Sequence, residues 1–131
     1  MKLTNFEALG AQKALSKLMT FDLPVKVSLD IALISNMVDE RVRVFNIVRN
    51  SLFKKYSIKT SSDGTKGVIK FESTVEGNEQ KKENLDAFME KFNELLEAKT
   101  EDMIFKKIEL PSDIMVKAEI LKNITEFMVI A

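Results

Sequence analysis

The sequence predicts a mostly helical α+β domain with a long central helix and a small antiparallel sheet. Three observations lead to this prediction. About 30 consecutive residues carry no glycine and no internal proline, with apolar residues at helical spacing. Two further segments, at about 4–20 and 78–98, also have amphipathic helical patterns. Short runs with a two-residue period lie between and after these helices, an order typical of α+β proteins.

The first helix is expected over residues 4–20. Thr4 and Glu7 have the spacing of a capping box, in which a hydroxyl and a carboxylate satisfy the first free backbone N–H groups reciprocally. The apolar residues of this helix form a rough stripe: Leu9, Ala14, Leu15, Leu18 and Met19. The helix should end before Pro24, because proline disfavours helical geometry in the residue before it.

The long helix is expected over about 25–56, after Pro24, whose missing N–H costs nothing at a helix start. At 100° per residue, one apolar sector comprises Val27, Ile31, Ile34, Val38, Val42, Phe45, Leu52 and Tyr56. A second apolar sector comprises Leu29, Leu33, Met37, Val44 and Ile47. A helix with two apolar faces is covered from two sides. It is either the central element of the domain or a helix covered partly by another copy of the protein.

A small sheet is expected after the long helix. Residues 57–61 and 67–73 read as two strands around a turn, where Asp63-Gly64 supplies a positive φ. A two-stranded hairpin rarely holds together in water without further cover. Residues 103–110 are therefore the expected third strand of the same antiparallel sheet.

Two more helices are expected in the second half of the chain. The helix at about 78–98 can be capped by Asn78 and has one apolar face: Leu85, Phe88, Met89, Phe92, Leu95 and Leu96. The last helix, about 112–129, follows Pro111 with Ser112 or Asp113 as its cap. Its apolar C-terminal end should dock on this domain or contribute to an interface, because an undocked end frays.

Composition narrows the class of protein. The 131 residues show no linker or repeat, which predicts a single domain over 1–131. The net charge is zero, so no global basic field attracts nucleic acid or an anionic membrane. Glu7 stands where a secretory signal would have its apolar core, no apolar run reaches membrane-spanning length, and cysteine is absent. These features favour a cytoplasmic protein with no disulfides.

The residue types available for chemistry are few. Histidine and cysteine are absent, which removes the commonest general base and metal ligands and the thiol nucleophile. Asp39 and Glu40 are adjacent, but neighbours on a helix diverge by about 100° and cannot converge on one atom. We expect Asp39 to be solvated and Glu40 to be ion-paired. Gly64 and Gly67 lack the spacing of a phosphate loop. We therefore expect no enzyme, no catalytic residue, no cofactor and no metal.

The long helix carries the candidate interaction surface. Its members are the apolar residues Leu33, Met37, Val44 and Ile47 and the basic residues Arg41, Arg43, Arg49, Lys54 and Lys55. Arg41 and Arg49 border the main apolar stripe and could extend into solvent, stack on an aromatic ring or pair with an acid. The basic residues point in several directions, which disfavours nucleic acid but leaves it as the alternative partner.

Charge offers a second indication of how the helices associate. The long helix has a positive balance, whereas residues 76–102 have a negative one. Opposite signs favour packing these helices together, or packing one copy of the protein against another. The alternative is that both charged faces are simply solvated, since exposed ion pairs are weak.

Several motifs in this order resemble a known family. They are "LPVK" before the long helix, "KKY" at its end, "FMEKFNELLE" in the acidic helix, "IELP", and "AEILKNITEFMVI" at the C-terminus. Together they are similar to a family of small proteins of unknown function from phages and prophages of Gram-positive bacteria. The similarity covers nearly the whole chain from about Phe6. The segment "SSDGTKGVIKFESTVEG" departs from it, so the resemblance supports no role for the hairpin.

The resemblance implies a bacteriophage origin and an accessory or assembly role, and it brings no catalytic residues. The expected function is that of a non-enzymatic phage-encoded protein that binds another protein. The partner could be a further copy in an oligomer, a component of the virion, or a host or phage factor that the protein inhibits. The expected location is the cytoplasm of the bacterial host, with the virion as the alternative.

Overall fold

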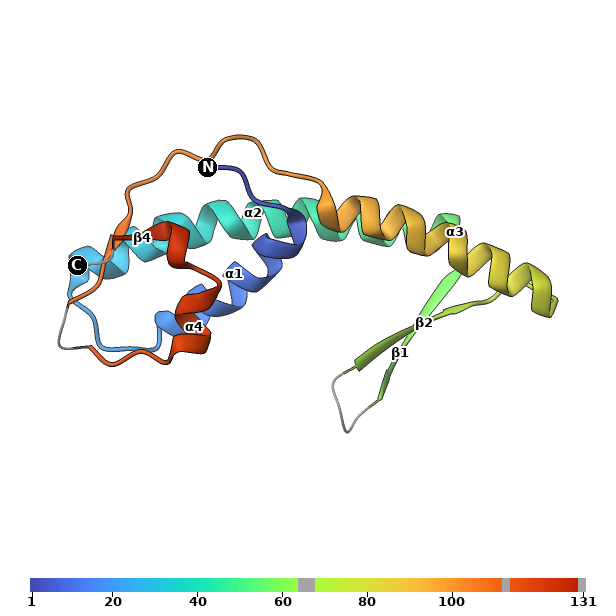
Figure 1. The fold of residues 1–131 in the computed structure, drawn as a ribbon, viewed down its shortest axis with the longest axis horizontal. Helices are drawn as coiled ribbons and strands as arrows, with labels where there is room; N and C mark the ends of the chain where they lie inside the picture. The colour runs from blue at the N-terminus through green and yellow to red at the C-terminus, as the bar shows by residue number, and fades with distance from the viewer. Residues whose placement is uncertain (64–67, 112–113, 130–131) are drawn as a thin grey trace. The chain divides into compact units, whose positions relative to one another are not determined.

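The computed structural model describes residues 1–63, 68–111 and 114–129 (Figure 1). Its helices are α1 (Asn5–Leu18), α2 (Val25–Lys55), α3 (Asn78–Glu97), α4 (Ala118–Lys122) and the 3-10 helix η1 (Thr125–Phe127). Its strands are β1 (Ile58–Asp63), β2 (Val68–Ser73), β3 (Ile108–Glu109) and β4 (Met128–Val129). This confirms the predicted fold class, which is mostly helical with one long helix and a small antiparallel sheet.

The chain forms two compact units. Unit 1 comprises Met1–Arg43 and Ala98–Ala131, and unit 2 comprises Val44–Glu97. The helix α2 contributes its first part to unit 1 and its last part to unit 2. Compactness does not by itself make a unit a domain, because a domain also folds independently. The single domain expected over 1–131 stays a prediction.

The first two helices begin where their local signals predict. In α1 the Thr4 hydroxyl oxygen accepts a hydrogen bond from the Glu7 amide at 3.0 Å, and a Glu7 carboxylate oxygen accepts one from the Thr4 amide at 3.0 Å. This confirms the capping box. The helix α2 begins at Val25, directly after Pro24. Both starts are therefore explained by residues next to them in the sequence.

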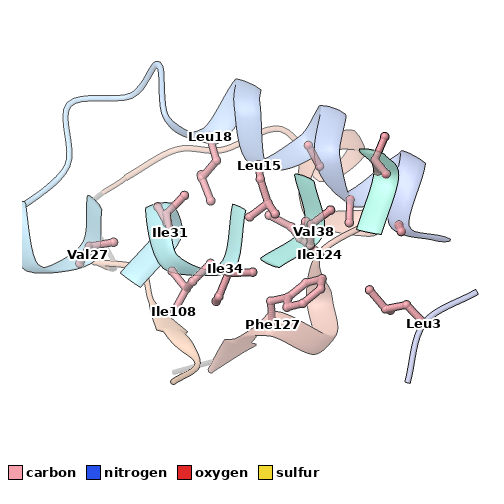
Figure 2. Packing of buried hydrophobic residues seen from close by; sticks show 14 residues of the cluster. Leu3, Leu15, Leu18, Val27, Ile31, Ile34, Val38, Ile108, Ile124 and Phe127 are labelled. Atoms are coloured by element: carbon pink, nitrogen blue, oxygen red, sulfur yellow. The ribbon is translucent and has the colours of Figure 1, made fainter. Parts of the chain in front are cut away.

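The core of unit 1 is mainly aliphatic. Figure 2 shows Leu15 and Leu18 of α1 pointing toward the α2 side chains. The predicted sector of α2 is buried within unit 1: Val27, Ile31, Ile34, Val38 and Val42. Ile108, Ile124 and Phe127 from the C-terminal part complete the cluster (Figure 2). Segments far apart in the sequence thus share one core.

Backbone hydrogen bonds join the N-terminal segment to the start of the C-terminal part of unit 1. The Asn5 amide donates to the Ala98 carbonyl at 3.0 Å, and the Met103 amide donates to the Met1 carbonyl at 2.8 Å. Between them, the Leu3 amide donates to the buried Thr100 hydroxyl at 3.0 Å. These bonds satisfy buried polar groups and hold the two sequence stretches of unit 1 together.

The expected third strand at 103–110 is wrong in both extent and partner. Only Ile108–Glu109 form a strand, β3, and it pairs in parallel with β4, with Ile108 opposite Met128. The hairpin keeps its two strands β1 and β2. Ile108 is completely buried in the unit 1 core, whereas the hairpin belongs to unit 2. Burial of this side chain decides the pairing, because strand preference depends mainly on packing.

The expected helix at 112–129 is also corrected. The cap residues Ser112 and Asp113 lie outside the described residues, and α4 covers only Ala118–Lys122. Asn123 and the β-branched residues that follow are poor helix formers. The chain then turns through η1 and buries Ile124 and Phe127. These two side chains dock the described C-terminal segment within unit 1, which is one of the two alternatives that the sequence predicted.

Unit 2 consists of the last part of α2, the hairpin and α3. Strands β1 and β2 pair antiparallel from Ile58 opposite Ser73 to Asp63 opposite Val68, which confirms the hairpin. Gly64, the predicted turn residue, lies outside the described residues. The Asn84 side-chain amide of α3 donates to the Tyr56 carbonyl and to the Ser73 hydroxyl oxygen. One polar side chain thus links the three elements.

An aromatic cluster forms the core of unit 2. Phe88 of α3 is completely buried, and its ring centroid lies 5.4 Å from Phe71 of β2 and 5.6 Å from Phe53 of α2. Phe92 lies 5.2 Å from Phe71. The predicted apolar face of α3 is therefore the one that packs. Among the described residues, no salt bridge joins α2 to α3, so aromatic packing joins the two helices.

Candidate interaction surface

Two members of the second apolar sector of α2, Leu29 and Leu33, are exposed in unit 1, and so is Val25, which the sequence did not assign to that sector. In unit 1, Val25 is 77%, Leu29 60% and Leu33 65% exposed. These residues recur at four-residue steps and therefore lie on one face of the helix. We call them the apolar face of α2. Unit 1 therefore does not cover α2 at these positions. The other alternative, that another copy of the protein partly covers the helix, stays a prediction.

The other predicted apolar members of the surface differ in exposure. Met37 is half-buried in unit 1. Val44 and Ile47 belong to unit 2 and are both exposed, as is the neighbouring Val48. Contiguous exposed apolar area of this kind marks interaction sites more often than single exposed residues do. Unit 2 thus presents its own short apolar segment on α2.

The arginines in unit 1 are engaged within the chain. The Arg41 Nε donates to the Asn5 side-chain oxygen at 3.2 Å, and its Nη2 donates to the Lys99 carbonyl at 3.3 Å. Arg43 forms an exposed salt bridge with Glu40 at 3.0 Å. Arg41 therefore acts as a structural link. Arg43 contributes little to stability, because exposed pairs are screened.

The basic residues of unit 2 do not form a strip with a common direction. Arg49 lies over the Phe53 ring, with its Cζ atom 5.6 Å from the centroid, one of the arrangements expected for it. Its Nη2 makes a long contact of 3.5 Å to the Asn50 side chain. Its buried Nε finds no hydrogen-bond partner among the described residues. Lys54 and Lys55 are exposed at the C-terminal end of α2.

The acidic pair on α2 behaves as expected. Glu40 is the partner of Arg43, and Asp39 accepts a hydrogen bond from the Gln12 side chain at 2.9 Å while remaining exposed. Elsewhere, the Met1 ammonium donates to the Asp102 carboxylate at 2.7 Å. This hydrogen bond and the positive charge of the amine lower the pKa of Asp102. A surface ion pair explains this shift, and it points to no acid–base chemistry.

The structure also shows a hollow that the sequence did not predict. It lies in unit 1 between α1 and the C-terminal elements α4 and η1, and its volume is about 510 Å³. Its lining includes the apolar residues Leu3, Phe6, Leu9 and Phe127 and the charged residues Glu7, Lys13, Lys122 and Glu126, and Phe6 keeps 68% of its surface exposed. The available signal was Phe6 itself, an aromatic residue outside the buried stripe of α1.

Comparisons with known proteins give no match to a protein-family model, to a curated protein or to a solved structure. Within residues 1–63, 68–111 and 114–129, no three acidic side chains gather closely enough to hold a metal ion. In the same ranges, no helix has both the length and the apolarity of a membrane span. The functional proposal therefore rests on the exposed apolar and basic residues of α2.

Proposed function

We propose that this chain is a non-enzymatic protein that acts by binding another protein through the apolar face of α2. The single observation that carries the proposal is the exposure of Val25, Leu29 and Leu33 at one helical spacing. Burying one such side chain completely contributes roughly 1.5–3 kcal/mol. A partner that covers this face buries several such side chains, and each adds to the free energy of binding. Helices are recognised in this way by an apolar groove or by another helix.

The resemblance to small phage and prophage proteins suggests the setting. In that setting the chain is a bacteriophage accessory protein, present in the cytoplasm of the host or in the virion. It assembles with further copies, assists virion assembly, or inhibits a host or phage factor. The alternative of nucleic-acid binding has less support, because Arg41, Arg43 and Arg49 are directed to different partners within the chain.

The test compares two adjacent residues of α2. Leu33→Glu changes the exposed face, and Ile34→Glu changes the buried one. We expect Leu33→Glu to retain the helical circular dichroism and thermal midpoint of the wild type. Ile34→Glu should unfold the chain, because it buries an unpaired charge. If Leu33→Glu stays folded while Ile34→Glu unfolds, a loss of binding in Leu33→Glu cannot be due to unfolding.

Binding is then measured by chemical cross-linking and mass spectrometry in bacteria that express the chain, with and without infection by a phage that carries its gene. We expect cross-linked partners that Leu33→Glu and Leu29→Glu both lose. As a matched control, Ile104→Glu alters a more exposed apolar residue of unit 1, at 90%, outside α2. If Leu33→Glu and Leu29→Glu keep every partner that the wild type has, the proposal is wrong.

A further inference from the structure

The apolar face of α2 has a basic residue near one end and an acidic residue near the other. Lys26 lies seven residues before Leu33, and Glu40 lies seven residues after it. Seven residues make almost two turns of an α-helix, so these three side chains share one side of the helix. Lys26 and Glu40 are both exposed, whereas Asp30, one turn after Lys26, is half-buried. The face therefore has a positive end, an apolar middle and a negative end.

Most other charged side chains in this part of α2 are engaged within the chain. Asp39 and Arg41 both form hydrogen bonds with side chains of α1. Arg43 forms an exposed salt bridge of 3.0 Å with one carboxylate oxygen of Glu40. A carboxylate accepts hydrogen bonds on two oxygens, so Glu40 can take a second basic partner. Lys26 forms no salt bridge within the described part of the chain. Lys26 and Glu40 are therefore available to a charged partner.

These end charges make the face complementary to itself in one orientation. In a dimer with a two-fold axis the same surface of both copies meets. If the helices run antiparallel and the axis passes at Leu33, Lys26 of each copy lies opposite Glu40 of the other, because both are seven residues from the axis. A parallel pair would instead place like charges side by side, which is unfavourable. The charges thus favour antiparallel pairing in a single register.

We propose that the apolar face of α2 binds the same face of a second copy of this chain, antiparallel, with the two-fold axis at Leu33. This inference rests on the proposed function and names the partner of that same surface. Burial of Leu29 and Leu33 in both copies provides the affinity. The pairs of Lys26 with Glu40 determine the orientation, because charges at an interface give specificity more than affinity. A contact one helix wide is small among specific interfaces, so we expect a monomer–dimer equilibrium in the micromolar range.

The first experiment measures mass by sedimentation equilibrium over a concentration series. We expect the mass of the wild type to rise from the chain mass of 14.9 kDa toward twice that value. Leu33→Glu should weaken dimerisation by roughly tenfold or more, because two carboxylates then meet at the axis in place of two leucines. Ile104→Glu makes the same kind of change at an exposed residue of unit 1 outside α2. It is the matched control and should dimerise like the wild type.

The second experiment reads the orientation from disulfide formation, using single cysteines in a chain that has none of its own. Antiparallel pairing about Leu33 separates the two copies of Val25 by about 24 Å along the helix, whereas the two copies of Leu33 face each other. A disulfide needs Cα atoms within roughly 7 Å of each other. Under mild oxidation, Leu33→Cys should form linked dimers much faster than Val25→Cys. Ile104→Cys measures the rate of chance encounters.

The third experiment exchanges the end charges. Lys26→Glu places a carboxylate at both ends of the face, and Glu40→Lys places an ammonium group at both ends. Each variant alone should dimerise about tenfold more weakly than the wild type, because each dimer loses two attractive pairs and gains two repulsive ones. An equimolar mixture should dimerise as well as the wild type, because each heterodimer regains two pairs of opposite charge. High salt should reduce these differences.

Four outcomes would overturn this inference. A wild type that stays monomeric at every concentration excludes the dimer. A dimer that Leu33→Glu leaves intact places the interface elsewhere. Equal rates of disulfide formation at positions 25 and 33 would show a parallel pair. A mixture of the two charge variants that associates no better than either one alone would show that Lys26 and Glu40 do not meet.

The proposed function can fail or hold independently of the dimer. If the wild type is monomeric in solution but Leu33→Glu loses cross-linked partners in cells, binding through the apolar face of α2 stands and a second copy is the wrong partner. If Leu33→Glu keeps both the dimer and every cellular partner, the inference and the proposed function are both wrong.

Discussion

The two units of this chain are stabilised by different kinds of side chain. Unit 1 packs mainly aliphatic residues from α1, α2 and the C-terminal segment, with Leu15 and Ile31 completely buried and one aromatic pair, Phe105 and Phe127. Unit 2 packs aromatic rings around one completely buried residue, Phe88. Unit 1 also joins two stretches of sequence, whereas unit 2 is a single contiguous stretch. One chain thus builds two cores by different means.

The difference shows what each core depends on. In unit 1 many side chains share the buried apolar area. Truncating one of them therefore removes only a modest part of that area. Among the residues whose burial is described, which leaves out 62–69, unit 2 has fewer buried residues than unit 1. Its ring contacts are concentrated on Phe88, Phe71 and Phe92. Unit 1 must also bring together residues separated by the whole of unit 2, which costs loop-closure entropy. Its core and its backbone bonds to residues 98–103 offset that cost.

The largest expected effect comes from Phe88→Ala. Truncating a fully buried phenylalanine lowers the free energy of unfolding by about 3–5 kcal/mol, because it removes packing contacts and leaves a cavity. Ile34→Ala is the counterpart in unit 1, with an expected loss of about 2–5 kcal/mol. Tyr56 is the only tyrosine and lies in unit 2, so its fluorescence follows that unit, while circular dichroism follows the helices of both.

This pair of variants also tests the single-domain prediction. If the chain is one domain, fluorescence and circular dichroism give the same urea midpoint in the wild type, and both variants lower it for both probes. If Phe88→Ala lowers the fluorescence midpoint and Ile34→Ala leaves that midpoint unchanged, the two units unfold separately. The single-domain prediction would then be wrong, and the two cores would belong to two domains.

A smaller effect is expected at the start of α1. Thr4→Ala removes the hydroxyl that accepts from the Glu7 amide, which lowers the free energy of unfolding by about 1 kcal/mol. Ser16→Ala is the control, because Ser16 is an exposed residue in the same helix and alanine is a better helix former. Urea unfolding followed by circular dichroism measures both. Equal effects of the two substitutions would show that the cap does not stabilise unit 1.

The smallest effect is expected at the end of α2, in unit 2. Ser57 has φ 50°, a left-handed conformation that costs free energy for a residue with a Cβ atom. Ser57→Gly should raise the free energy of unfolding by up to about 1 kcal/mol, after the entropy of glycine is subtracted. Ser51→Gly, in the interior of α2, should lower it by about 0.5 kcal/mol. Tyrosine fluorescence in urea measures the pair, and destabilisation by Ser57→Gly would contradict the argument.

The sequence by itself determined the first three helices and their buried faces, but not the extent of the last one. Thr4, Glu7 and Pro24 act on backbone groups within a few residues, so they mark the starts of α1 and α2 correctly. The sector from Val27 to Val42 was also predictable, because side-chain directions on a helix repeat with a fixed angle. The second apolar sector was visible in the same way. Its periodicity showed that Leu29 and Leu33 share a face.

Only the tertiary structure decided what covers each face and where the short strands pair. Ile108 joins β4 in the unit 1 core, Ile124 and Phe127 end the last helix early, and Leu33 is left exposed. The hollow beside Phe6 exists only because α1 and the C-terminal segment meet. In each case, residues distant in sequence compete for the same buried space. A local pattern predicts which face of an element is apolar, but it does not predict which residue packs on that face.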